Sequence, residues 1–325
     1  MTILVTGGAG YVGSTLVPVL LNRGYRVRVL DCLLHGGNSL LPVWSHPQFE
    51  FRRGDIRDSN VVPPALKEID AVVHLAAIVG DPACAQQPDL AKGTNFEASS
   101  TLLMESRNAG VKRFIFASTC SNYGRMKDTS QYVDENSDLS PVSLYAETKV
   151  SFEGTLLEPS QTNGLCATPL RIATVFGVSP RMRFDLTVNQ FALEMVAKRY
   201  LVVYGEQFWR PYIHVIDVAR AIVAVLEAPE QQVENQVFNV GSTDQNYRKH
   251  DLVEMIRPYA SDATVKYVLK DEDPRDYRVS FEKIRKELGF RIILTMEAGI
   301  RELVRLVRDG IIHDFDNPRY RNTGR

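Results

Sequence analysis

Small hydroxyl and thiol side chains cluster in the segment STCSNYG, residues 118–124, directly after the apolar run FIFA. A tyrosine and a lysine follow in the segment YAETK, at Tyr145 and Lys149. This spacing places the two side chains on the same face of a helix. A phenol with a pKa of about 10 is a poor base at neutral pH, but a neighbouring ammonium group favours its anion. The pair could therefore accept a proton from a substrate hydroxyl.

A glycine-rich stretch near the N-terminus, ILVTGGAGYVG, predicts a turn that binds phosphates. Gly7, Gly10 and Gly13 lie directly after a short apolar run and at the expected start of a helix. Glycines at these positions permit a tight turn, close approach to a pyrophosphate and close packing of the helix on a sheet. Because a helix N-terminus offers N–H groups to phosphates, Tyr11 and Val12 are also candidate cofactor-binding residues.

Asp31 ends the second predicted strand, 18 residues after Gly13. A carboxylate there can accept hydrogen bonds from both hydroxyls of an adenosine ribose, and it would repel a 2′-phosphate. NAD is therefore favoured over NADP. Gly13 could instead serve only a turn, and Asp31 could be a solvated strand end, but the coincidence of turn, helix start and carboxylate favours a dinucleotide site. The cationic nicotinamide ring of NAD, which accepts the hydride, would also favour the anion of Tyr145.

Short β-branched runs alternate with helix-length segments through the first half of the chain. Strands are expected in TILVT, RVRVLD, FEFRRGD, AVVHLAA and RFIFAST, and long helices at 88–109 and 142–160. This alternation of strands and helices predicts an α/β fold, with a Rossmann-type doubly wound parallel sheet. We expect an NAD-binding domain over residues 1–177, with 212–237 returning to it, and a smaller mixed α/β substrate lobe over 178–325.

The composition excludes several classes of function. The 38 basic and 39 acidic residues nearly balance and form no long basic run, so a nucleic-acid partner is not expected. The apolar stretches are too short for a signal peptide or a membrane helix, and we expect a soluble cytoplasmic protein. The cysteines show no metal-binding or disulfide spacing, which predicts neither a zinc site nor a disulfide framework; they are Cys32, Cys84, Cys120 and Cys166.

The order of the motifs resembles that of the extended short-chain dehydrogenase/reductases, in the branch that acts on nucleotide-sugars. These motifs are TGGAGYVG, GDIRD, HLAA, Asn95, STCSNYG, YAETK, LRIATVFG, WRPYIHV, FNVG and DPRDY. The resemblance is to 4-epimerases of UDP-galactose and UDP-glucuronate in particular. It implies an NAD cofactor, a nucleotide-diphosphate sugar substrate and a homodimer built on the two long helices.

The resemblance also implies roles for individual residues. Thr119 would be the hydroxyl partner of Tyr145, with Lys149 holding the nicotinamide ribose, and Asn95 would tie strands together. The further cofactor-binding residues would be Asp55 and Ile56 at the adenine, and Leu75, Ala76 and Ala77 along the cofactor groove. The substrate-binding residues would be Cys120, Ser121, Thr174, Asn189, Tyr204, Arg210 and Arg275. Any one of the last four could instead be a surface ion-pair former.

Departures from the resembled family bear on the reaction. The 4,6-dehydratases carry Asp-Glu after the threonine and the decarboxylases carry Glu at the second position, where this chain has Cys120 and Ser121. Small residues there are typical of 4-epimerases. Asn122 and Thr174 also depart from the family's usual valine and asparagine. The basic segment SPRMRFD, residues 179–185, indicates that an arginine within it meets an additional anionic group such as a carboxylate; the candidates are Arg181 and Arg183.

The sequence therefore predicts an NAD-dependent nucleotide-sugar epimerase that inverts C4 through a transient 4-keto sugar. An alternative is a reductase or dehydratase of a nucleotide-keto-sugar that uses Cys120 as a base, although a small buried residue is the favoured interpretation of that thiol. A non-catalytic dinucleotide sensor is disfavoured, because a sensor has no need to keep Thr119, Tyr145 and Lys149 together.

Overall fold

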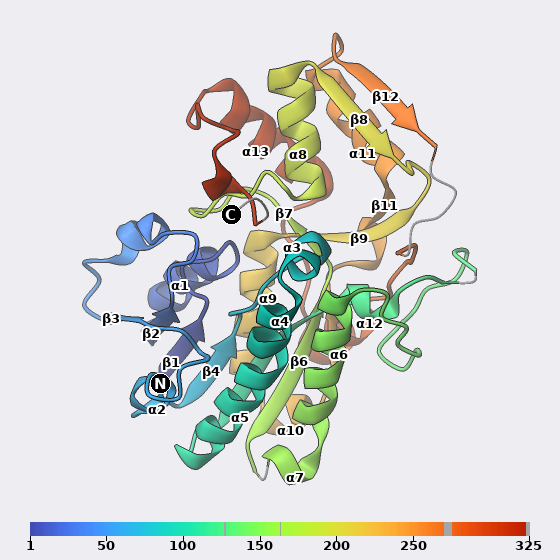
Figure 1. Cartoon of the computed structure of the whole chain (residues 1–325). Helices are drawn as coiled ribbons and strands as arrows, with labels where there is room; N and C mark the ends of the chain where they lie inside the picture. Colours follow the sequence, from blue (N-terminus) through green and yellow to red (C-terminus); the bar gives the residue numbers. More distant parts are fainter. Residues whose placement is uncertain (127, 163, 270–274, 323–325) are drawn as a thin grey trace.

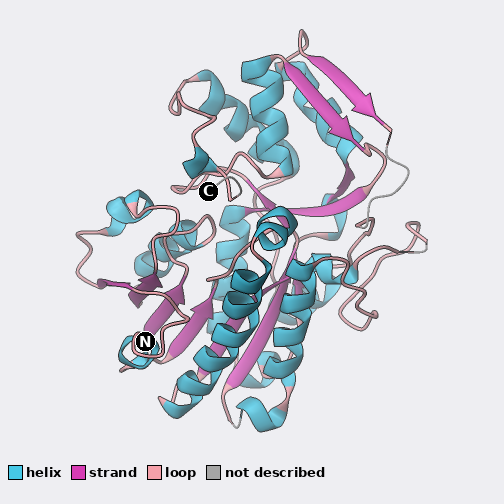
Figure 2. Ribbon diagram, viewed as in Figure 1, coloured by secondary structure: helices cyan, strands magenta, loops and turns pink. Residues whose placement is uncertain are grey.

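The computed structural model describes residues 1–126, 128–162, 164–269 and 275–322. Two lobes are stacked on one another, with a parallel sheet and its helices in the larger lobe and further helices and short strands in the smaller one (Figures 1 and 2). Within the described part of the chain, no helix combines the length and apolar character needed to cross a bilayer.

The larger lobe contains a seven-stranded sheet in which every pairing is parallel. Its order is β10-β6-β5-β4-β1-β2-β3. The strands are β1 (Thr2–Thr6), β2 (Arg26–Asp31), β3 (Phe49–Arg53), β4 (Ala71–His74), β5 (Arg113–Thr119), β6 (Cys166–Ile172) and β10 (Phe238–Val240). The order reverses between β1 and β4, which is where doubly wound sheets bind ligands. The predicted Rossmann-type fold is confirmed.

Helices cover both faces of this sheet (Figure 2). They are α1 (Gly13–Asn22), α2 (Val62–Leu66), α3 (Asp81–Gln86), α4 (Pro88–Lys92), α5 (Ala98–Asn108), α6 (Leu144–Leu157), α7 (Pro159–Thr162), α9 (Val215–Glu227), α10 (Glu230–Val233) and α12 (Glu282–Leu288). Ser143 begins α6 as its cap, accepting a hydrogen bond from the N–H of Ala146, and Pro159 follows closely on the end of α6.

The expected helix at 88–109 is divided by a π-helical turn at Gly93–Glu97. Asn95 lies in this turn, and its side chain forms two hydrogen bonds with the backbone of Ile78, at 2.8 and 3.0 Å. Asn95 therefore ties a helix to the loop after β4, whereas the sequence predicted a tie between strands. The π turn is the physical reason, because it turns the amide toward that loop.

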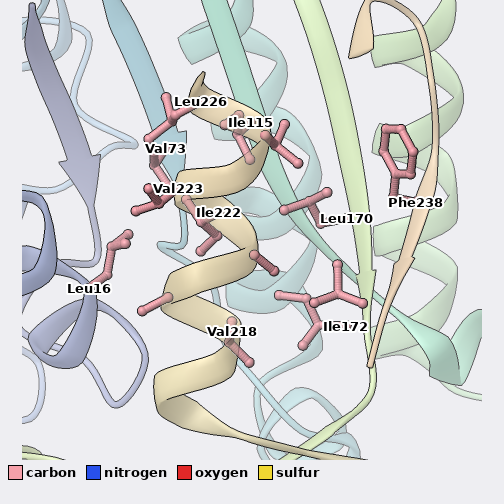
Figure 3. Close-up of a cluster of buried hydrophobic side chains, with 14 of the residues drawn as sticks. Leu16, Val73, Ile115, Leu170, Ile172, Val218, Ile222, Val223, Leu226 and Phe238 are labelled. Atoms are coloured by element: carbon pink, nitrogen blue, oxygen red, sulfur yellow. The ribbon is translucent and has the colours of Figure 1, made fainter. Parts of the chain in front are cut away.

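The helix α9 brings the middle of the chain back to the first lobe. Its apolar residues Val218, Ile222 and Leu226 recur at helical spacing and pack against the sheet, opposite side chains such as Ile115 and Leu170 (Figure 3). Burying each of these side chains contributes about 1.5–3 kcal/mol relative to exposure. The larger lobe thus depends on residues from both halves of the sequence.

The smaller lobe has its own hydrophobic core, built by α8, α11 and α13 against short strands. Its elements are β7 (Thr174–Phe176), α8 (Thr187–Leu193), β8 (Tyr200–Tyr204), β9 (Trp209–His214), β11 (Asn246–Arg248), α11 (Lys249–Ile256), β12 (Thr264–Val268) and α13 (Met296–Arg308). The strands form two small sheets, β11-β9-β7 and β12-β8. β7 begins directly after β6, so this lobe starts at the ligand-binding end of the parallel sheet.

A buried ion pair joins α6 to β6. The Arg171 guanidinium donates two hydrogen bonds to Oε1 of Glu153, at 2.6 and 2.9 Å, and the two side chains are only 6% and 3% exposed. The other oxygen of Glu153 accepts a hydrogen bond from the Ser118 hydroxyl at 2.6 Å. Arg171 also donates to the hydroxyl of Tyr123. The pair therefore connects α6, β6 and the end of β5 through one fully bonded carboxylate.

Replacing Arg171 with Met should lower the free energy of unfolding by about 3–5 kcal/mol, because it leaves Glu153 buried without its charge partner. The double variant Arg171→Met/Glu153→Met should lose less than the sum of the two single variants, since neither charge is then stranded. Urea unfolding followed by circular dichroism measures both. Arg23→Met, at the exposed ion pair with Glu227, is the control and should change stability by about 1 kcal/mol or less. Equal losses at both sites would contradict the analysis.

Candidate active site

A cavity of about 570 Å³ lies at the carboxyl ends of the parallel strands and extends to the second lobe. It brings together most of the residues that the sequence singled out. Those in its lining are Gly7, Gly10, Tyr11, Val12, Gly13, Asp31, Asp55, Ile56, Leu75, Ala76, Ala77, Thr119, Ser121, Tyr145, Lys149, Thr174 and Arg275. Both the expected cofactor residues and the expected reacting residues therefore face one space.

The glycine turn at the start of α1 has no room for side chains. Gly7 has a φ of +73°, and a Cβ atom there would lie 2.8 Å from the backbone nitrogen of Ala76. A Cβ atom on Gly13 would lie 2.3 Å from the carbonyl oxygen of Gly7. The turn therefore brings the backbone and the N-terminus of α1 to the cavity without intervening side chains, as the pyrophosphate of a dinucleotide requires.

Asp31 lies at the end of β2 and in the cavity lining. Its two carboxylate oxygens accept hydrogen bonds from the backbone N–H groups of Ala9 and Leu33, at 2.9 and 2.8 Å. Burial raises the pKa of Asp31, and these two N–H donors oppose the rise. Each oxygen keeps a further lone pair that can accept a ribose hydroxyl. The turn and this carboxylate together fit the dinucleotide predicted from the sequence.

Tyr145 and Lys149 both face the cavity from α6. The Lys149 ammonium lies 5.9 Å from the centroid of the Tyr145 ring and donates a hydrogen bond to the Ala117 carbonyl at 2.8 Å. Burial lowers the pKa of Lys149 to about 7. Burial of this lysine therefore opposes its positive charge.

Burial also raises the pKa of Tyr145, and nearby Cys84 and Asp81 raise it further. The charge of Arg183 and a hydrogen bond with Thr119 oppose this rise. Desolvation is thus the largest influence on the phenol in this structure, and it opposes the anion. Tyr145 is in contact with the predicted Thr119 hydroxyl. That Lys149 and a nicotinamide together favour the phenolate stays a prediction.

Cys120 lies outside the cavity lining, although the sequence grouped it with the substrate-binding residues. It is 1% exposed, and its thiol donates a hydrogen bond to the Arg171 carbonyl at 3.1 Å. Burial raises the pKa of the thiol well above its usual range. The chain enters a 3₁₀ turn at Cys120, which directs this side chain into the core while Ser121 lines the cavity.

Three other expected substrate residues also lie outside the lining. Asn189 is fully buried, bonds to Gly177 and Arg183, and donates a hydrogen bond to the hydroxyl of Tyr11 in the glycine turn at 3.1 Å. Tyr204 is 57% exposed at the end of β8. Arg210 donates to its own neighbour's carbonyl and packs over the ring of Tyr277, which does line the cavity. The arginine therefore lies behind the wall of the site.

The structure adds residues that the sequence analysis missed. Asp81, at the start of α3, forms an ion pair with Arg275 at 3.0 Å and accepts a hydrogen bond from Ser143, the cap of α6, at 2.7 Å. Tyr277 also lines the cavity, and its place in the motif DPRDY is the signal that could have identified it. Asp81 follows the motif HLAA by only a few residues, but no spacing rule connects it to Arg275.

The two arginines of SPRMRFD both line the cavity. Arg183 forms two hydrogen bonds with Asp185, at 2.9 and 2.8 Å, so its charge is already matched by a carboxylate. The backbone N–H of Arg181 donates to the Ser14 hydroxyl on α1, which places it beside the glycine turn. Asp185 therefore already pairs with Arg183, and the expectation that the segment meets an additional anionic group stays a prediction.

Lys149 should make stability depend on pH in a defined window. Its pKa falls from 10.5 to about 7 on folding, so between those values the unfolded chain binds more protons and stability rises with pH. The unfolding free energy of NAD-free wild type, relative to Lys149→Met, should therefore grow by on the order of 1.4 kcal/mol per pH unit above about pH 7. Denaturant titrations from pH 6 to 9 measure it. Lys198→Met, at an exposed ion pair, should give a flat difference, and a flat difference for Lys149→Met would contradict the assignment.

Comparisons with known proteins agree with this geometry. The family model described as the NAD dependent epimerase/dehydratase family matches residues 3–241. A UDP-glucose 4-epimerase of Corynebacterium glutamicum is 30% identical over 89% of this chain and 90% of its own length. A dTDP-glucose 4,6-dehydratase of Streptomyces niveus is 29% identical over 95% and 93%.

A solved structure carries the same fold and a bound dinucleotide. The UDP-glucose 4-epimerase of Thermus thermophilus, in complex with NAD, superimposes with a TM-score of 0.83 at 28% identity, covering 95% of this chain and all of its own. Epimerases and dehydratases are thus about equally similar to this chain. The match over most of the sequence and the shared fold show that the chain belongs to the NAD dependent epimerase/dehydratase family and that its cofactor is NAD.

Proposed function

We propose that this protein is a nucleotide-sugar 4-epimerase. The observation that carries the proposal is the set of proton-bearing groups at the reacting end of the cavity. Thr119, Ser121 and Tyr145 line it, and the STCSNYG loop contributes no carboxyl group. Inversion at one carbon through a ketone needs a single proton acceptor and donor, whereas elimination of water needs a further acid and base. The site is equipped for the first reaction.

The acidic side chains near Tyr145 support this choice. Asp81 is bonded to Arg275 and Ser143, and Asp185 is bonded to Arg183. Both carboxylates are thereby engaged by partners within the protein. Neither group takes the place of the Asp-Glu pair that the resemblance assigns to dehydratases.

The side chains divide the work as follows. NAD, when bound, supplies the acceptor and later the donor of a hydride. The Thr119 hydroxyl holds the 4-hydroxyl oxygen of the sugar, and Tyr145 takes its proton and afterwards returns one. Lys149 is placed to bind the nicotinamide ribose. The diphosphate of the substrate lies against Arg275, whose planar guanidinium suits phosphate oxygens.

The positive charge needed by the phenolate comes from more than one source. Arg183 is always charged and acts on Tyr145 in the structure. A cationic nicotinamide ring adds to it when NAD is bound. In a site removed from water each charge acts strongly, so the pKa of Tyr145 falls as the site is loaded. Proton transfer is thereby coupled to cofactor binding.

The second candidate function is a dehydratase or reductase of a nucleotide-keto-sugar. The similarity to dTDP-glucose 4,6-dehydratases favours it. The Cys120 thiol, with its raised pKa and its place in the core, does not favour it as the base. Homodimerisation through the helices at 88–109 and 142–160 also stays a proposal; the exposed Phe96 and Met104 on the first of them support it.

Product analysis in heavy water separates the two functions. A panel of UDP- and dTDP-sugars is incubated with the enzyme and followed by proton NMR. Direct return of the hydride to C4 gives an epimer without deuterium on carbon, and this is the expected result. A dehydrated sugar, or an epimer that carries solvent deuterium, would reject the 4-epimerase.

Substitution of Tyr145 should lower kcat strongly, whereas substitution of Cys120 should change it little. Tyr145→Phe should reduce kcat on the order of 100- to 10,000-fold, because the proton acceptor is lost while the ring remains. Bound NAD, measured after extraction, should be unchanged. Cys120→Ala should keep kcat within about threefold of wild type, since the thiol faces the core. Loss of turnover in Cys120→Ala with a normal unfolding midpoint would support the dehydratase or reductase instead.

A further inference from the structure

Several arginines in the cavity lining are paired with aspartates that also line it. Among the described residues these pairs are Asp55–Arg57, Arg183–Asp185 and Asp81–Arg275, with N–O distances of 2.7, 2.8 and 3.0 Å. In the first two pairs the partners are close neighbours in sequence. The third pair joins the start of α3 to the segment just before Tyr277. It is therefore the pair that connects two distant segments of the cavity wall.

Both side chains of the Asp81–Arg275 pair are accessible. The arginine side chain is 37% exposed and the aspartate side chain is 25% exposed, and both residues line the cavity. A partly exposed ion pair contributes little net free energy, because water competes for both charges. An anionic ligand in the cavity can therefore reach the guanidinium and replace the carboxylate as its partner.

The backbone that follows Arg275 is fixed by hydrogen bonds. The Asp276 carboxylate accepts one from the N–H of Trp209 at 2.9 Å, and the Asp276 carbonyl accepts one from the N–H of Met126 at 2.9 Å. The N–H of Tyr277 donates to the Trp209 carbonyl at 3.4 Å. A change of partner at Arg275 therefore needs rotation of its long side chain and no displacement of this backbone.

Asp81 is held in place independently of the arginine. Its Oδ1 accepts a hydrogen bond from the Ser143 hydroxyl at 2.7 Å, whereas its Oδ2 pairs with Arg275. Ser143 is the cap of α6 and accepts a hydrogen bond from the N–H of Ala146, in the first turn of the helix that carries Tyr145. The carboxylate can therefore keep its place beside α6 when the guanidinium leaves it.

We propose that Asp81 competes with the substrate for Arg275. In the ligand-free site Asp81 holds the guanidinium, and the diphosphate of the nucleotide-sugar takes its place on binding. This inference rests on the proposed function, since it takes Arg275 to bind that diphosphate. A diphosphate carries more negative charge than one carboxylate, and its oxygens suit the planar guanidinium. Asp81 thereby lowers substrate affinity and determines specificity, because a ligand without a strongly anionic group leaves the pair intact.

Calorimetric titration of the NAD-loaded protein tests the proposal. UDP, dTDP, GDP, ADP and CDP are screened, and the one that binds most tightly is the probe; none of them carries the sugar that reacts. Asp81→Asn keeps an oxygen for the Ser143 hydroxyl but loses the charge. It should tighten binding of the probe by about 3- to 10-fold, the effect of a partly exposed ion pair. Asp81→Ala, which also removes the charge, should tighten binding too, and high salt should reduce both effects.

A double-mutant cycle shows whether the effect passes through the arginine. Arg275→Met alone should weaken binding of the probe, and adding Asp81→Asn to it should change the affinity little. Ligand-observed NMR replaces calorimetry where binding is weak. Asp262→Asn is the matched control, because Asp262 pairs with Arg199 at 2.8 Å outside the cavity lining, and it should leave the affinity unchanged. NAD content and the unfolding midpoint are measured for every variant.

The outcomes separate this proposal from the proposed function. Unchanged or weaker binding in Asp81→Asn would overturn the competition. Equal tightening with and without Arg275 would also overturn it, since Asp81 would then only repel the diphosphate. Tightening that requires Arg275, combined with a dehydrated product in the heavy-water panel, would support the role of Asp81 and reject the 4-epimerase. Binding of none of the five nucleotides would overturn both.

Discussion

The attachment of α6 to the end of β5 determines the geometry of the whole site. Two buried polar contacts make it: the Lys149 ammonium on the Ala117 carbonyl, and the Glu153 carboxylate on the Ser118 hydroxyl. Tyr145, Lys149 and Glu153 recur every four residues on one face of the helix, so the contacts are one turn apart. They fix the position of the tyrosine relative to the threonine that follows Ser118. Arg171 then holds the carboxylate from the neighbouring strand.

The same burial that fixes these groups also opposes their ionisation. Desolvation raises the pKa of Tyr145 and lowers that of Lys149, so neither charge is favoured in the structure. Charges brought by ligands and by Arg183 are therefore expected to act more strongly on these buried groups than they would in bulk water. In the proposed mechanism, the charges of bound ligands therefore favour proton transfer once the site is filled, without a moving catalytic group.

The first lobe was predictable because its signals are local. Each strand is a short apolar run, the glycines of the turn are adjacent in sequence, and Tyr145 and Lys149 are one helical turn apart. The second lobe was not, because its residues meet the cavity through packing between distant segments. Asn189 is fully buried among its bonds to Tyr11, Gly177 and Arg183, and Arg210 lies behind Tyr277. The direction of the Cys120 side chain depends on a 3₁₀ turn, which the periodicity of the sequence does not predict. Asn322 lines the cavity although it lies more than 170 residues after Tyr145 in the sequence.

The last strand of the parallel sheet, β10, has a consequence for how the protein is made. Its residues 238–240 pair with β6, and they leave the ribosome long after the rest of the sheet. Until then β6 presents an unpaired edge. A nascent chain or a truncated gene product that stops near the middle of the sequence would therefore be prone to aggregate, and chaperone binding during synthesis should be concentrated before this strand emerges.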